Sequence, residues 1–154
     1  THDEQMRAGS VVAALVSPQA GTNLLDPRTN ALIATLDTAG RPGFTFDPPL
    51  GYAWPLEVGK SWTTTYTVTN HGAARTVPMA ITYRVDAYEE ITVPAGSFHT
   101  FRMLSTDSLG EVTQQWTAPA LGIQTVRRIL DRPATHPLGA GHLEGRLTSI
   151  VRPK

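Results

Sequence analysis

Alternation of apolar and polar residues is the feature of this chain that most limits its fold. Within residues 61–69, the large side chains of Trp62 and Tyr66 share one face with Thr64 and Val68, because successive residues of a strand point to opposite sides. Residues 76–88 alternate in the same way. No stretch of ten or more residues shows a helical period, and there are no capped helix candidates. The chain is therefore expected to consist of strands.

Turn residues separate these runs at short spacing. Clusters rich in Gly, Pro, Asn and Asp stand at residues 70–72, 94–97, 107–110 and 118–122. Further strands are predicted at residues 11–16, 31–37, 44–46, 98–105, 111–117, 123–130 and 142–151. Short turns between consecutive strands favour antiparallel pairing. The predicted fold is all-β: one domain, an antiparallel meander of about nine strands forming a strongly curved sheet or partly open barrel.

Three segments do not fit the strand pattern. Residues 1–10 are polar, so we expect a flexible N-terminal arm, with residues 11–154 as the single β domain. Residues 17–30 are rich in turn formers and are predicted to be a loop. Residues 47–58 contain three prolines, which excludes a central strand. Because this segment also contains Tyr52, Trp54 and Leu56, we expect it to lie across a core opening as a buried strap.

Composition excludes several classes of function. The 13 basic residues balance the 13 acidic residues, so the chain has no general attraction for nucleic acid or anionic lipid. The absence of cysteine excludes a disulfide scaffold, a thiol nucleophile and an iron–sulfur site. The longest apolar run, residues 11–16, is far shorter than the about 20 residues of a membrane-spanning helix. We expect no nucleic acid partner, no membrane span in this chain, no metal and no cofactor.

Candidate catalytic and anion-binding residues are sparse. His136 and His142 flank a Pro/Gly loop and, with Asp131 or Glu144, have the chemistry of a zinc site. The simpler interpretation is two exposed loop histidines, because no helical or strand spacing fixes them together. An arginine group has the charge to bind a carboxylate or phosphate, although cross-strand ion pairs with Asp86, Glu111 or Asp131 explain it more simply. Its members are Arg84, Arg102, Arg127, Arg128 and Arg132.

Three sequence blocks resemble an exported bacterial family of unknown function. They are PLEVGKSW at residues 55–62, EITVPAGSF at residues 90–98 and WTAPALG at residues 116–122. The resemblance covers about residues 42–151 and is distantly similar to half-barrel folds of lipoprotein-carrier type. It implies a periplasmic or secreted β-domain whose signal peptide has been removed, and it implies no reaction. The blocks also have a structural explanation, since Gly and Pro end and begin strands.

Aromatic residues provide the remaining candidate site. Trp54, Trp62, Tyr66, Tyr83 and Trp116 build either a filled core or the wall of a ligand cavity, since pockets are mainly apolar. The first hypothesis is a non-catalytic binding or interaction module of the bacterial envelope, holding an apolar or acyl ligand or contacting an envelope protein. The alternatives are a structural accessory domain that pairs through an exposed edge strand and a hydrolase with His136 and His142 in its site.

Overall fold

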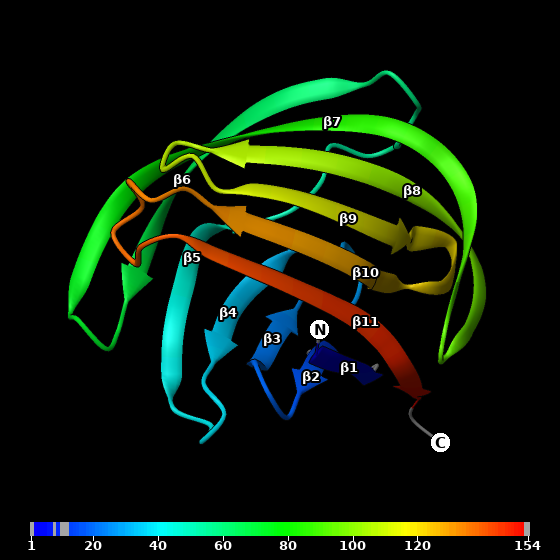
Figure 1. Ribbon diagram of the computed structural model, residues 1–154, viewed down its shortest axis with the longest axis horizontal. Helices are drawn as coiled ribbons and strands as arrows, with labels where there is room; N and C mark the ends of the chain where they lie inside the picture. Colours follow the sequence, from blue (N-terminus) through cyan, green and yellow to red (C-terminus); the bar gives the residue numbers. More distant parts are fainter. Residues whose placement is uncertain (1, 8, 10–12, 153–154) are drawn as a thin grey trace.

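The chain folds into a closed barrel of eleven strands, ordered β1-β11-β10-β9-β8-β7-β6-β5-β4-β3-β2 (Figure 1). The structure is a computed structural model that describes residues 2–7, 9 and 13–152. The strands are β1 His2–Arg7, β2 Ala13–Ser17, β3 Gly21–Leu25, β4 Leu32–Leu36, β5 Pro42–Leu50, β6 Ser61–Asn70, β7 Arg75–Val93, β8 Gly96–Asp107, β9 Val112–Ala118, β10 Ile123–Arg132 and β11 Gly141–Val151. Among the described residues, the one helical element is a 3₁₀ turn at Pro119–Leu121. The all-β, strongly curved antiparallel fold predicted from the sequence is confirmed.

Strand β1 closes the barrel. It pairs antiparallel with β2 and parallel with β11, where Glu4 lies opposite Leu147. The structure here differs from the flexible arm predicted for residues 1–10, because Glu4 and Met6 are buried in the closed wall. Residues 1, 8 and 10 lie outside the described residues.

The strands differ from the prediction at three further places. Strand β3 lies within the loop predicted at residues 17–30, and β2 begins at Ala13, whereas residues 11 and 12 lie outside the described residues. With β1 and β3 added, the described residues contain eleven strands rather than about nine. Strand β5 also extends to Leu50, into the segment predicted as a strap.

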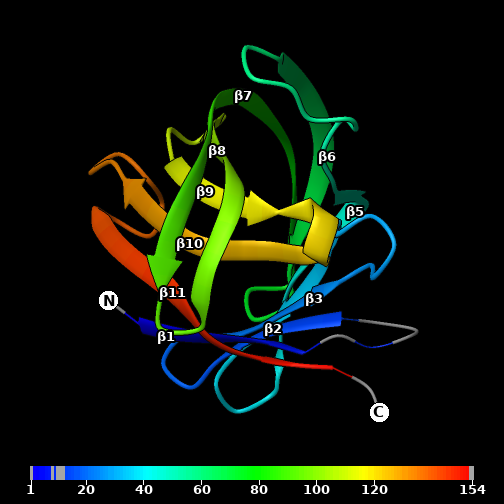
Figure 2. The same ribbon diagram turned by 90° about the vertical axis from the view of Figure 1, so that its right-hand side faces the viewer.

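The hairpin formed by β7 and β8 is long and strongly bent. Its ladder shifts register between Val85 and Ala87, and such a bulge increases the local bend. Figure 2 shows the hairpin crossing in front of β9 and β10 and ending beside β11. At its tip, the Ala95 N–H donates to the Leu147 carbonyl (3.1 Å). The tip of the hairpin therefore covers part of the barrel wall, while the base of the same hairpin belongs to that wall.

Two hydrophobic clusters form the core. The first, called the seam cluster below, gathers residues from both ends of the chain and from the hairpin tip. It comprises Met6, Ala13, Leu15, Leu25, Val93, Phe98, Trp116, Ala118, Ile123, Val126 and Leu147. The second, called the aromatic cluster, has Leu56, Tyr83, Val85 and Met103 at its centre, with Tyr52, Trp62, Ile81 and Phe101 packed against them.

Candidate functional site

The barrel wall parts between β5 and β6. Strand β6 pairs with β7 along its whole length, Ser61–Asn70, whereas its ladder with β5 covers only Thr67–Asn70. Strand β5 pairs with β4 from Pro42 to Leu50, so beyond Asp47 it continues beside β4 alone. Proline has no N–H to donate to a ladder, so Pro49, whose backbone nitrogen faces β6, cannot donate to it. The result is an opening between sequence-adjacent strands.

A concavity of about 570 Å³ lies at this opening. Its lining comes from β5, β6, β7 and the turn after β8, and comprises Asp47, Pro48, Thr65, Tyr66, Thr67, Pro78, Met79, Ala80 and Ser108. Most of these side chains are apolar or lack charge, and Asp47 is the one ionisable carboxylate among them. The arrangement suits an apolar group with a few polar contacts.

Tyr66 belongs to both the concavity and the core. Its ring centroid lies 6.1 Å from that of Phe46, and the side chain is buried. Burial, followed by the nearby carboxylates of Asp107 and Glu111, raises the pKa of Tyr66 to about 12.

The strap beyond β5 covers the aromatic cluster. Trp62 stacks on Tyr83 with ring centroids 5.1 Å apart, and Tyr52 meets Tyr83 edge-on at 5.5 Å. Burial raises the pKa of both tyrosines. Leu56 is buried against these rings, while Lys60 Nζ donates to the carbonyls of Ala53 and Pro55. Residues 51–58 thus lie over the aromatic cluster, with Leu56 as their buried residue, whereas residues 47–50 of the predicted strap belong to β5.

The structure distributes the five predicted aromatic residues over four places. Trp62 and Tyr83 pack together in the aromatic cluster, whereas Tyr66 lines the concavity. Trp54 is 39% exposed on the strap, where its ring meets Tyr52 edge-on and its Nε1–H donates to the Thr29 carbonyl. Trp116 lies apart from all four, in the seam cluster. A ligand-binding role for these residues stays a prediction.

Trp116 has one polar partner at the edge of its ring and another over its face. Its Nε1–H donates to Glu89 Oε1 (2.9 Å), and the Arg127 guanidinium lies 5.2 Å from the ring centroid. Arg102 reaches the same Glu89 oxygen at 3.3 Å. These contacts describe a side chain fixed within the protein rather than one directed toward a ligand.

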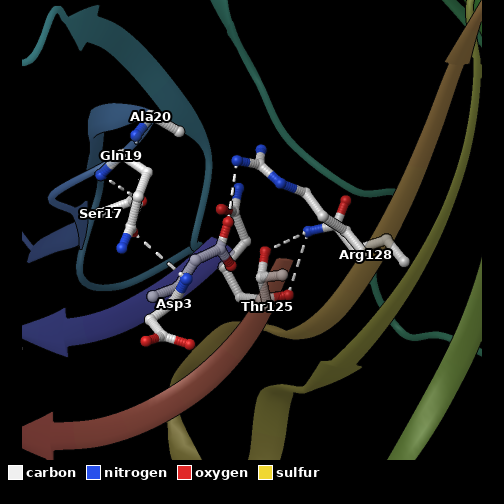
Figure 3. A network of polar contacts seen from close by, with 9 residues as sticks. Asp3, Ser17, Gln19, Ala20, Thr125 and Arg128 are labelled. Carbon is white, nitrogen blue, oxygen red and sulfur yellow. Dashed lines mark hydrogen bonds and ion pairs between the residues drawn. The ribbon is translucent and has the colours of Figure 1, made fainter. Parts of the chain in front are cut away.

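A polar network that sequence reasoning missed fastens the barrel seam. Glu4 is 1% exposed, and its Oε1 lies 2.8 Å from Arg128 of β10 (Figure 3). In the same view, the Asp3 N–H donates to Gln19 Oε1, which also accepts from Ser17 Oγ. No local sequence pattern links Glu4 to Arg128, because the two residues lie far apart in the chain. The one local signal is that Glu4 and Met6 are two residues apart, as residues on one face of a strand are.

The predicted arginine group does not converge on one site. Arg84 pairs with Asp86 on its own strand, and Arg128 pairs with Glu4. Arg102 and Arg127 instead surround Trp116, as described above. Arg84, Arg102 and Arg128 do contact carboxylates, but none forms the expected cross-strand pair with Asp86, Glu111 or Asp131. The Arg84–Asp86 pair lies within β7, and Glu89 and Glu4 were not among the expected partners.

The two candidate histidines contact different carboxylates. His136 is buried, with Nε2 3.8 Å from Glu111 Oε2, so the expectation of two exposed histidines is wrong for His136. His142 is exposed, and its ring nitrogens lie 2.6 Å from Asp131 and 3.3 Å from Glu144. These hydrogen bonds raise the pKa of His142. Within the described part of the chain, no three His, Asp or Glu side chains are placed to hold a metal ion.

Comparison with known proteins assigns the chain to no family. No family model matches the chain, and no curated protein matches it. A solved structure, the hypothetical lipoprotein YmcC from Escherichia coli, matches with a TM-score of 0.45 and 14% sequence identity, covering 88% of this chain and 70% of that one. The comparison identifies no ligand, partner or reaction for this chain. The resemblance of the three sequence blocks to an exported family stays a prediction.

No helix in the described residues is long and apolar enough to cross a membrane.

Proposed function

We propose that this chain is a non-catalytic binding module that holds an apolar or amphipathic ligand at the opening between β5 and β6. The observation that carries the proposal is the 570 Å³ concavity, to which Tyr66, Met79 and Ala80 contribute. Its volume lies within the about 300–1,000 Å³ that small-molecule sites occupy. An acyl chain or another apolar molecule fits this lining. We also propose that the protein acts in the bacterial envelope.

The packing of the interior favours the wall of the barrel over its lumen as the binding place. Tyr52, Trp62 and Tyr83 contact one another, and Leu56 covers them. An acyl chain inside this cluster would have to displace packed aromatic rings, which costs dispersion contacts and buried area. The concavity requires no such displacement.

A fluorescent apolar probe, 1-N-phenylnaphthylamine, tests the proposal. Probe binding to the purified chain is measured by fluorescence, with Ala80→Trp as the variant that fills the concavity. Thr92→Trp is the matched control, because Thr92 is an exposed residue of the same strand outside the concavity. We expect Ala80→Trp to lower probe affinity about tenfold or more and Thr92→Trp to leave it unchanged. Equal affinity in both variants would contradict the proposed site.

A further inference from the structure

Strand β6 presents an unpaired stretch of backbone at the opening. The His71 N–H donates to the Gly43 carbonyl (2.9 Å), and hydrogen-bonded positions alternate along an antiparallel ladder. Thr69 and Thr67 therefore direct their backbone groups toward β5, and Thr65 and Thr63 direct theirs to the same side. The ladder with β5 ends at Thr67. Within the described residues, no strand lies opposite Thr63 and Thr65 on this side.

Such an edge is a template for another extended chain, because each unpaired residue offers one N–H donor and one C=O acceptor. Thr63 and Thr65 also have exposed side chains, and threonine is favoured in strands. Their side chains point to the outer face together, with the Oγ1 of Thr63 bonded to that of Thr82 (2.8 Å). The ladder with β7 runs along the whole of β6, so it holds this edge in the extended conformation without a partner.

The surroundings of the edge favour a single strand. Asp47 and Pro48 stand on one side of the concavity, and Pro78 and Ala80 stand on the other. An edge strand of a second copy would bring its own flanking strands against Pro48, whereas an isolated peptide has no such neighbours. A peptide strand would also place alternate side chains in the apolar concavity.

Charge adds a further constraint on the occupant. Asp47 is exposed at the concavity, and Asp107 lies close enough to Tyr66 to contribute to its raised pKa. No basic side chain lines the concavity among the described residues. A Lys or Arg in the ligand would complement this side.

From these features we propose that the β6 edge binds an extended peptide that alternates apolar residues and contains Lys or Arg. The peptide adds as an antiparallel strand in the place that β5 leaves, opposite Thr63 and Thr65. This inference rests on the proposed function, since the apolar side chains of the peptide use the same concavity, and it assigns that site a class of partner.

The test uses a synthetic peptide of alternating Val and Thr with one central Lys. Binding is measured by fluorescence anisotropy, and amide exchange at Thr63 and Thr65 is measured by NMR. We expect the peptide to bind and to slow exchange at both residues. A matched peptide, N-methylated on every second residue, keeps the side chains but loses the donors facing β6. We expect its affinity to be lower by about tenfold or more. Equal binding of the two peptides would overturn the inference.

Protein variants locate the site independently. Thr65→Pro removes the N–H that faces the opening, whereas Thr65→Ala keeps it, so we expect only the proline variant to lose affinity for the peptide. Asp47→Asn should weaken binding of the Lys peptide and leave a Gln-substituted peptide unaffected. If edge exchange slows with protein concentration in the absence of peptide, the occupant is a second copy and the inference fails.

The two proposals fail separately. If 1-N-phenylnaphthylamine binds in an Ala80-dependent way and the peptide does not protect Thr63 and Thr65, the concavity remains a ligand site and strand addition is wrong. If the peptide protects the edge and the probe shows no Ala80-dependent binding, the edge is a partner site and the small-molecule function is wrong.

Discussion

The barrel wall is complete at the seam between β1 and β11, whereas it is incomplete at the opening between β5 and β6. At the seam, two strands far apart in the chain form a ladder from His2 to Arg7. At the opening, two strands adjacent in the chain pair through only four residues of β6 before they part. Closeness in sequence therefore does not decide where the wall is complete.

The chemistry of the two regions explains the difference. The seam has fully buried apolar residues such as Leu147 and Met6, together with the ion pair of Glu4 and Arg128. The opening has prolines on one strand and exposed threonines on the other. Buried area stabilises the seam, whereas the opening leaves backbone groups and apolar surface available. We infer that stability resides mainly at the seam and binding at the opening.

The largest expected effect compares one residue type in the two regions. Trp116 is 6% exposed in the seam cluster, whereas Trp54 is 39% exposed on the strap. We expect Trp116→Ala to lower the free energy of unfolding by about 3–5 kcal/mol, because it leaves a large cavity, and Trp54→Ala to lower it by less than about 1 kcal/mol. Urea unfolding followed by circular dichroism measures both. Similar losses would show that the strap contributes as much stability as the seam.

The seam ion pair should give the next largest effect. Glu4→Gln removes the charge that Arg128 contacts, and we expect a loss of about 1–3 kcal/mol in the free energy of unfolding, the usual worth of a hydrogen bond to a charged group. Asp3→Asn is the control, because the Asp3 carboxylate and its partner Arg146 are each about half exposed, and exposed pairs contribute little. A loss no larger for Glu4→Gln than for Asp3→Asn would show that the buried pair contributes no more to stability than an exposed pair.

The carboxylate of Glu111, near Tyr66, should lower the stability at neutral pH, in contrast to Glu4. Burial, reinforced by Asp107, raises the pKa of Glu111 above 4.5 despite His136 and two arginines. A carboxyl whose folded pKa is raised loses stability as pH rises from the unfolded pKa through the folded one. We therefore expect Glu111→Gln to have a higher melting temperature than the parent at pH 7, with the difference vanishing below the unfolded pKa. A lower melting temperature at pH 7 would mean that the attraction to His136, Arg128 and Arg132 exceeds the cost of burial.

The smallest effect on stability should come from Pro49, which the register places opposite Thr65. Pro49→Val restores an N–H directed at β6, so we expect slower amide exchange at Thr65 and a change below about 1 kcal/mol in the free energy of unfolding. Pro78→Val is the control, since Pro78 stands opposite Thr67 at a position whose backbone nitrogen points away from β6. Unchanged exchange at Thr65 in the first variant would show that more than proline holds the two strands apart.

Local patterns predicted the strands from Ser61 onward because these strands alternate strongly. Trp62 and Tyr83 face each other across the ladder between β6 and β7, as their spacing indicated. Strand β1 was missed because its residues are mostly polar, and a buried Glu4 is acceptable only beside Arg128, which lies on another strand. Propensity alone contains no information on such a distant partner.

The sequence identified some of the residues around the opening. The prolines within residues 47–58 excluded a continuous central strand there, and Tyr66 was among the candidate residues, although its binding role stays a prediction. Met79 and Ala80 were recognised as strand residues but not as part of a site, because their proximity to Pro48 depends on strand register. Register across a barrel is fixed by long-range packing and by bulges rather than by local composition.

The parallel pairing of β1 with β11 has a consequence for the order of folding. His2 pairs with Gly145, so this ladder requires nearly the whole chain to be looped back, whereas the β7–β8 hairpin forms between neighbours. Loop-closure entropy makes such distant pairings late and slow. Until β1 arrives, β2 and β11 each have an unpaired edge, and such edges promote association between chains. Refolding yield should therefore fall with protein concentration, because encounters between unfinished barrels compete with the final closure.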